Sequence, residues 1–330
     1  MIEYSEGIIA NAVLNGITIL PLIAILALSW RSIRHHSQPV KMAQAFLRAA
    51  VPVMLLATLI LTAQAALLAA ESNRPYMRLD VSRAAIYLSL TGYFIEYAGA
   101  ILGTLALYLA TTSAYYVVIG RLRWWRLIRI DAIVGGILLF AFDIAWYAKR
   151  VSDIEQDRVF PTYGLQWLPI IIDITLVVIS LIIVSFAAYV FGPLKRRSEL
   201  PVGHIPLFLL VASSFWLMRC TYMLAVDIKT VNEDWTYGES MAQIIYDPIF
   251  DRWASVVVLA LLALLLRKPL WSDPAVLLDA SAHQALSQPY YPQPQYQQQP
   301  VYQQQPHVQQ QQPVYDPRFQ QQVYYDGAIR

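Results

Sequence analysis

The first 268 residues alternate between long apolar runs and short polar segments. A helix rises about 1.5 Å per residue, so a run of about 20 residues crosses a hydrocarbon core of about 30 Å. A helix also satisfies its own backbone hydrogen bonds in lipid. Seven runs have spanning length, roughly residues 8–30, 46–70, 91–119, 128–147, 167–191, 205–228 and 244–266. We therefore predict an all-α membrane protein, a bundle of seven transmembrane helices, with an interfacial lead-in at residues 84–90 before the third.

The remainder of the chain has a different composition. Asp273-Pro274 is typical of a helix start and predicts a short interfacial helix within residues 269–286. Residues 287–330 are dominated by Gln, Pro and Tyr, with few charged or aliphatic side chains to build a core. We predict a disordered cytoplasmic tail, which either only solubilises the protein or binds a cytoplasmic protein partner.

Basic residues alternate from loop to loop and predict the orientation. Lys and Arg gather after the first, third, fifth and seventh runs, whereas the N-terminus and the even loops are acidic or mixed. Because loops rich in Lys and Arg stay in the cytoplasm, we place the N-terminus outside and the C-terminus in the cytoplasm. We expect the plasma membrane rather than an internal membrane.

The overall composition supports a membrane protein and excludes several other classes. Hydrophobic residues make up 57% of the chain and charged residues 14%, which is too apolar for a soluble domain. The net charge of +2 gives no reason to expect a nucleic-acid partner, and one cysteine allows neither a disulfide nor a cysteine metal site. No glycine-rich phosphate loop or nucleophile elbow is present. We therefore predict no catalytic residues, metal or cofactor, and membrane lipids as the main partners.

Ionisable side chains within the apolar runs are the candidates for a functional site. Each costs about 2.5–3.5 kcal/mol to insert, so it marks a binding or transport site by default. With the predicted orientation, the candidates gather in the outer half of the bundle. They are Glu96, Asp143, Asp173, Arg219, Asp247 and Asp251.

Arg219 is the one basic member of this set. Asp227 follows eight residues later, about 12 Å along the helix axis, so we expect it at the outer end of the helix and not as a partner. Asp173 or Glu96, from other helices, is the expected partner. Three aromatic residues nearby are expected to support the guanidinium: Phe215, Trp216 and Tyr222.

Two interpretations of these charges stay open. An ion pair between helices can simply fix their packing. However, the carboxylates outnumber the arginine, and this surplus favours a ligand, a lipid or cationic amphiphile with an amine group.

The specific motifs of known receptors are missing from the chain. The third run ends in VVIGRLRWW, without the Asp/Glu-Arg-Tyr of rhodopsin-like receptors, and the last run has no lysine for a retinal Schiff base. A signalling receptor or membrane sensor of another kind remains an alternative.

The region from the sixth to the seventh run resembles a known family. Arg219-Cys-Thr-Tyr222 is followed by an acid at Asp227, by Glu239, and by Tyr246-Asp247 at the start of the last run. This order is similar to that of the fungal seven-transmembrane lipid-translocating exporters, the family associated with aminocholesterol resistance and sphingoid-base export; Met223 stands where that family has a second arginine. The resemblance implies translocation or export of a lipid or amphiphile. A membrane organiser acting through the tail is a further alternative.

Overall fold

The computed structural model describes seven long helical stretches and no strand within residues 2–30, 38–71, 79–119, 125–156, 167–196, 205–232 and 246–266. Six are continuous α-helices, and the seventh begins as a π-helix, η2, that continues as α8. Their bounds are α1 (Ile2–Trp30), α2 (Gln38–Glu71), α3 (Leu79–Ile119), α4 (Trp125–Glu155), α5 (Leu168–Arg196), α6 (Ile205–Asn232), η2 (Pro248–Trp253) and α8 (Ala254–Leu266).

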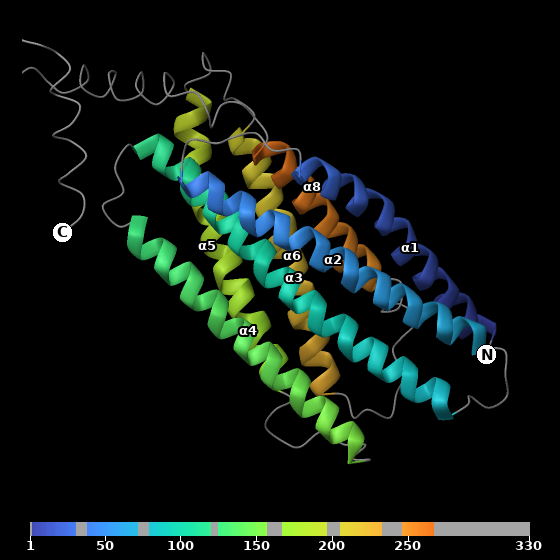
Figure 1. Cartoon of the computed structure of the whole chain (residues 1–330). Coiled ribbons are helices and arrows are strands. Elements are labelled where there is room, and N and C mark those ends of the chain that lie inside the picture. The colour runs from blue at the N-terminus through green and yellow to red at the C-terminus, as the bar shows by residue number, and fades with distance from the viewer. Residues whose placement is uncertain are drawn as a thin grey trace, which may run out of the picture. The chain divides into compact units, whose positions relative to one another are not determined.

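The helices close into a ring in which α3 lies between α2 and α4. Each helix contacts the next one in the chain, and α8 returns to contact α1 and α2. Helix α3 also contacts α5, α6 and α8, in addition to its neighbours α2 and α4. Figure 1 shows α1 and α4 on opposite sides of the bundle, with α3 between them. Residues of α3 are therefore placed to meet side chains from most of the other helices.

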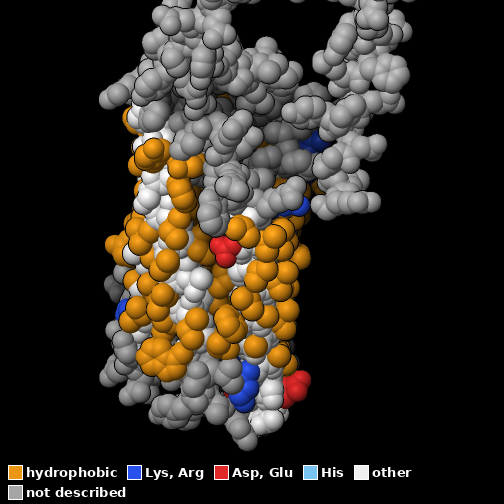
Figure 2. Space-filling view, turned by 90° about the vertical axis from the view of Figure 1, so that its left-hand side faces the viewer, with side chains coloured by type: hydrophobic (Ala, Val, Ile, Leu, Met, Phe, Trp, Pro, Cys, Tyr) orange, Lys and Arg blue, Asp and Glu red, His pale blue; other side chains and the backbone are white. Residues whose placement is uncertain are grey.

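Six helical segments have the length and hydropathy of membrane spans. They are Glu6–Trp30, Val40–Glu71, Val81–Tyr115, Leu168–Gly192, Ile205–Thr230 and Pro248–Leu266. Apolar side chains are exposed on the outer faces of these helices, and Figure 2 shows such side chains covering most of one described face, with few charged ones. In the described part of the chain, the protein is therefore an all-helical, multi-pass integral membrane protein.

Helix α4 is the one predicted span that is not among these six. It is 31 residues long and exposes apolar side chains, for example Ile137 at 63% and Leu138 at 54%. The helix extends past the predicted limits of 128–147 into polar sequence at both ends. This is possible because backbone hydrogen bonds, and not apolar side chains, continue a helix.

Helix α3 differs from its prediction at the N-terminal end. It runs without a break from Leu79, so residues 84–90 belong to the helix and are not a separate interfacial lead-in. No proline or glycine occurs between Leu79 and Gly92 to end the helix there. The candidate span accordingly begins at Val81.

Glycines on α3 allow two neighbouring helices to approach closely. A Cβ at Gly99 would lie 2.5 Å from Met54 Sδ of α2, and one at Gly103 would lie 2.9 Å from the Trp216 ring of α6. Such small residues are typical of tight helix contacts in membranes. These close contacts form a packing face of α3, and the neighbouring Glu96 is buried inside the bundle.

The predicted interfacial helix at 269–286, the disordered tail at 287–330 and most of the basic loop residues lie outside the described residues.

Candidate functional site

Four charged side chains from three helical elements form a buried group, here called the charge cluster: Glu96 of α3, Arg219 of α6, and Asp251 and Arg252 of η2. Arg219 Nη2 lies 2.6 Å from Asp251 Oδ1 and 3.5 Å from Glu96 Oε1. Arg252 Nη2 donates to Glu96 Oε2 at 2.9 Å, and its Nε lies 3.4 Å from Asp251 Oδ2. None of the four residues is more than 7% exposed. Two guanidinium groups and two carboxylates therefore balance one another out of contact with water.

The charge cluster confirms part of the predicted pairing of Arg219. Glu96 is a partner, as expected, but the closest carboxylate belongs to Asp251 and not to Asp173. Arg219 is also not the one buried cation in this group, because Arg252 lies beside it. The charges of these four residues balance, so the predicted surplus of carboxylates is carried by the other buried acids, Asp143 and Asp173 among them.

The π-helix η2 places two consecutive residues in the charge cluster. Asp251 and Arg252 are both buried and both contact Glu96 or Arg219. In a regular α-helix successive side chains diverge by about 100°. A π-helix has more residues in each turn, so the angle between successive side chains is smaller. Short π segments inside α-helices occur frequently at functional sites.

Trp216 supports Arg219, and Phe215 does not. The Trp216 ring centroid is 5.2 Å from Arg219 Cζ, and its Nε1 donates to Thr104 Oγ1 of α3 at 2.9 Å. Trp216 is 1% exposed, whereas Phe215 is 37% exposed. The prediction for Phe215 is wrong because one residue along a helix turns the side chain by about 100°, here from the interior to the outer face.

Asp173 of α5 and Asp227 of α6 share the hydroxyl of Tyr97, and we call these two residues the acid pair. Tyr97 Oη lies 2.9 Å from Asp227 Oδ2 and 3.5 Å from Asp173 Oδ2. Asp173 is 1% exposed and Asp227 is half-buried. Neither forms an ion pair with any residue that the structure describes. Asp227 was expected only to mark the outer end of its helix. In the structure it also links α6 to α3 through Tyr97, which in turn contacts Asp173 of α5.

Asp143 lies apart from the charge cluster and the acid pair. It is fully buried, and neither carboxyl oxygen has a hydrogen-bond partner in the described part of the chain. It shares a face of α4 with Phe140 and Tyr147, whose rings contact Phe94 of α3. The structure therefore places Asp143 in the aromatic contact between α3 and α4.

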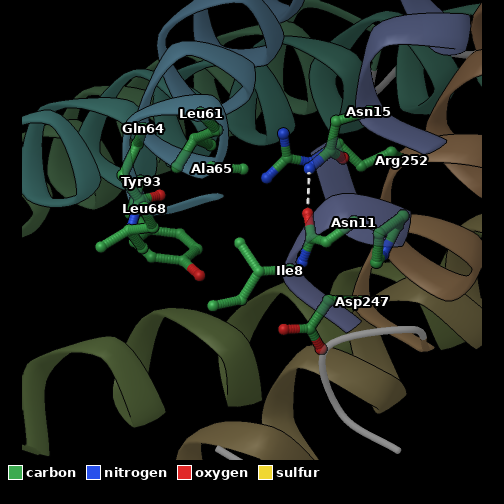
Figure 3. Close-up of a pocket in the computed structure, with 11 residues that line it drawn as sticks. Ile8, Asn11, Asn15, Leu61, Gln64, Ala65, Leu68, Tyr93, Asp247 and Arg252 are labelled. Atoms are coloured by element: carbon green, nitrogen blue, oxygen red, sulfur yellow. Dashed lines mark hydrogen bonds between the residues drawn. The ribbon is translucent and has the colours of Figure 1, made fainter. Parts of the chain in front are cut away.

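A polar cavity adjoins the charge cluster through Arg252. Its volume, measured as space for water, is about 70 Å³, enough for a few waters or a small polar group. Figure 3 shows Arg252 and Asn15 on one side of the cavity, Tyr93 on another, and Asp247, the residue directly before η2, below them. The lining residues are Ile8, Asn11, Asn15, Leu61, Gln64, Ala65, Leu68, Tyr93, Asp247, Pro248 and Arg252.

Asp247 and Tyr222 meet at the edge of this cavity. The Tyr222 hydroxyl donates to Asp247 Oδ1, and the Tyr222 ring stacks on Phe250, with centroids 5.3 Å apart. The structure thus pairs Tyr222 with Asp247, whereas its sequence position had predicted a contact with Arg219.

Sequence analysis missed Arg252 and the polar residues of α1 and α2. Arg252 is an ionisable residue in the last apolar run, so the rule that selected Asp251 applied to it as well. Asn11 and Asn15 stand four residues apart in the first run, a spacing that puts two amides on one face of the helix. Gln64 is likewise a polar side chain within the second run.

No protein-family model, curated protein or solved structure matches the chain. The class of the protein therefore follows from the helices and their burial alone. It is a multi-pass integral membrane protein that holds a buried, charge-balanced cluster and an adjoining polar cavity.

Proposed function

We propose that the protein binds and translocates a lipid or other amphiphile through the polar region inside its bundle. The observation that carries this proposal is the polar cavity next to the charge cluster, within helices that have the properties of membrane spans. Ionisable residues at such positions are costly and are found where substrates or ions pass. The resemblance of residues 219–247 to lipid-translocating exporters supports the same function.

The carboxylates outside the charge cluster favour a ligand that carries positive charge or donates hydrogen bonds. Within the described residues, Asp173, Asp227 and Asp143 have no guanidinium or ammonium partner. Each of them must be protonated, hydrated or bound by a donor group, because an isolated buried carboxylate is very costly. An amine-bearing amphiphile meets this need.

The topology that fits this function has seven spans, with α4 as the seventh. Its length and its exposed apolar residues support a lipid-facing position. The basic loops after α1, α3, α5 and α8 favour an N-terminus outside and a C-terminus in the cytoplasm. In that orientation the charge cluster and the acid pair lie in the outer half of the bundle, and we propose the plasma membrane as the location.

Neutralising the buried acids is the test of this function in cells. We expect Asp173→Asn to lower export of an amine-bearing amphiphile about tenfold or more, since losing a charged hydrogen bond costs about 1.5–3 kcal/mol. Asp143→Asn is expected to reduce export as well. Export is measured as loss of cell-associated labelled amphiphile, and surface expression is quantified in parallel.

Asp131→Asn is the matched control, because Asp131 is an exposed carboxylate on α4. This variant is expected to export at the wild-type rate. Unchanged export in both Asp143→Asn and Asp173→Asn, at normal surface expression, would refute the proposed function.

A signalling receptor or sensor and a membrane organiser are the alternative functions, and deletion of residues 287–330 separates them. A transporter is expected to keep its export activity without the tail, because the polar cavity lies within residues 8–252. A receptor would still bind its ligand but lose signalling. An organiser would lose all activity, and that result would contradict the transport function.

A further inference from the structure

An apolar groove lies on the outer face of α6, opposite Arg219. It is lined by α6 residues at helical spacing, among them Ser214, Leu217, Met218, Thr221 and Ala225, and by Phe250 of η2. Its volume is about 500 Å³, and it is a shallow, open groove and not an enclosed pocket. Because this face belongs to a span-length helix, the groove opens toward lipid, and a hydrocarbon chain is the occupant that matches its lining.

One hydrogen bond links the lining of the groove to the lining of the polar cavity. Tyr222 lines the groove, Asp247 lines the cavity, and the Tyr222 hydroxyl donates to the Asp247 carboxylate. Stacking on Phe250 holds the Tyr222 ring in place. A rotation of this one side chain would break the hydrogen bond that joins the two linings.

The cavity also contains a donor and an acceptor whose bonding is incomplete. Arg252 Nη1 and Asn15 Oδ1 are buried and have no hydrogen-bond partner among the described residues. Both residues line the cavity, and they are 7% and 5% exposed. A buried polar atom without a partner costs about 1–3 kcal/mol. A hydroxyl group accepts one hydrogen bond and donates another, so a hydroxyl-bearing group matches the chemistry of both atoms.

We propose that the groove and the cavity together form the binding site of one single-chain amphiphile with a hydroxyl-bearing head group. The chain lies in the groove against α6, the head group enters the cavity between Asn15 and Arg252, and the Tyr222–Asp247 hydrogen bond is the gate between them. This inference rests on the proposed amphiphile function and names the entry route and the head-group chemistry for it.

Photolabelling of the purified full-length protein in phosphatidylcholine vesicles tests the site. The probe is a long-chain 1,2-diol with a diazirine in the chain, and the comparison probe has the same chain without hydroxyls. We expect the diol to label the α6 face from Ser214 to Ala225, and the hydroxyl-free probe to label it more weakly. Ala225→Trp should abolish this labelling by filling the groove, whereas Leu207→Trp, at an exposed α6 position outside the groove, should leave it unchanged.

Two further variants test the gate and the head-group contact. Tyr222→Phe keeps the stacking ring but removes the hydroxyl, so diol translocation in the same vesicles should become faster. Asn15→Leu removes the acceptor, so the preference for the diol over the hydroxyl-free probe should disappear. If the preference persists in Asn15→Leu, water and not a head group occupies the cavity, and the head-group assignment is wrong.

The remaining outcomes separate this inference from the proposed function. Labelling spread evenly over the lipid-facing helices, with translocation intact in Ala225→Trp, would overturn the groove site and leave the transport function standing. Diol-selective labelling of the groove without translocation of the diol by any variant would support the binding site and overturn its assignment as an entry route.

Discussion

Replacing Arg219 by methionine is expected to lower the free energy of unfolding by about 3–5 kcal/mol. The substitution removes the cation that lies 2.6 Å from Asp251 and 3.5 Å from Glu96, and it leaves two carboxylates with the single guanidinium of Arg252. An uncompensated buried charge costs far more than an ion pair contributes. The measurement is unfolding of the purified protein in mixed micelles by titration with a denaturing detergent.

Two variants make the Arg219 result specific to the charge cluster. Lys41→Met removes an exposed charge on α2 and should change the free energy of unfolding by no more than about 0.5 kcal/mol. Adding Asp251→Asn to Arg219→Met removes the one uncompensated negative charge, so it should restore part of the lost stability. Equal stability of Arg219→Met and Lys41→Met would show that these groups are not buried as the structure has them.

Replacing Trp216 by alanine is expected to cost about 3–5 kcal/mol, the usual loss for a fully buried large aromatic. The ring fills the space above Gly103, donates a hydrogen bond to Thr104, and lies against the Arg219 guanidinium. No other residue type combines that volume with a donor at this point. The same detergent titration measures the effect.

Phe215→Ala is the control for Trp216, because the two aromatic residues are adjacent in the chain and only one is buried. We expect the Phe215 variant to lose less than about 1 kcal/mol, since its ring faces outward on α6. Trp216→Phe keeps most of the volume but not the donor, so it should fall between the two. A larger loss for Phe215→Ala than for Trp216→Ala would contradict the assigned orientation of α6.

The sequence predicted the helices well because a membrane leaves few alternatives for an apolar run. Each predicted run lies within or overlaps a helix, and Glu96, a candidate because it is ionisable within an apolar run, is buried inside the bundle. The limits were less accurate, as in α3, because helices continue into polar sequence and hydropathy alone does not mark their ends.

The pairing within the site could not be predicted to the same degree. Glu96 was named as a partner of Arg219, but Asp251 is closer, and the choice depends on which helices are neighbours and how each is rotated. A 3.6-residue period does not predict the π-helix at Pro248–Trp253, so it does not predict that the consecutive residues Asp251 and Arg252 both reach the charge cluster. The Tyr97 hydroxyl between Asp173 and Asp227 likewise depends on packing across three helices.

Translocation by the purified full-length protein in vesicles tests the central claim most directly. A fluorescent amine-bearing amphiphile is placed in both leaflets, and a membrane-impermeant reagent destroys the fluorescence on the outside. With the wild-type protein, we expect the protected inner signal to be lost faster than in protein-free vesicles, and Asp173→Asn to slow this loss. Identical rates in wild-type, Asp173→Asn and protein-free vesicles would contradict a role in amphiphile translocation.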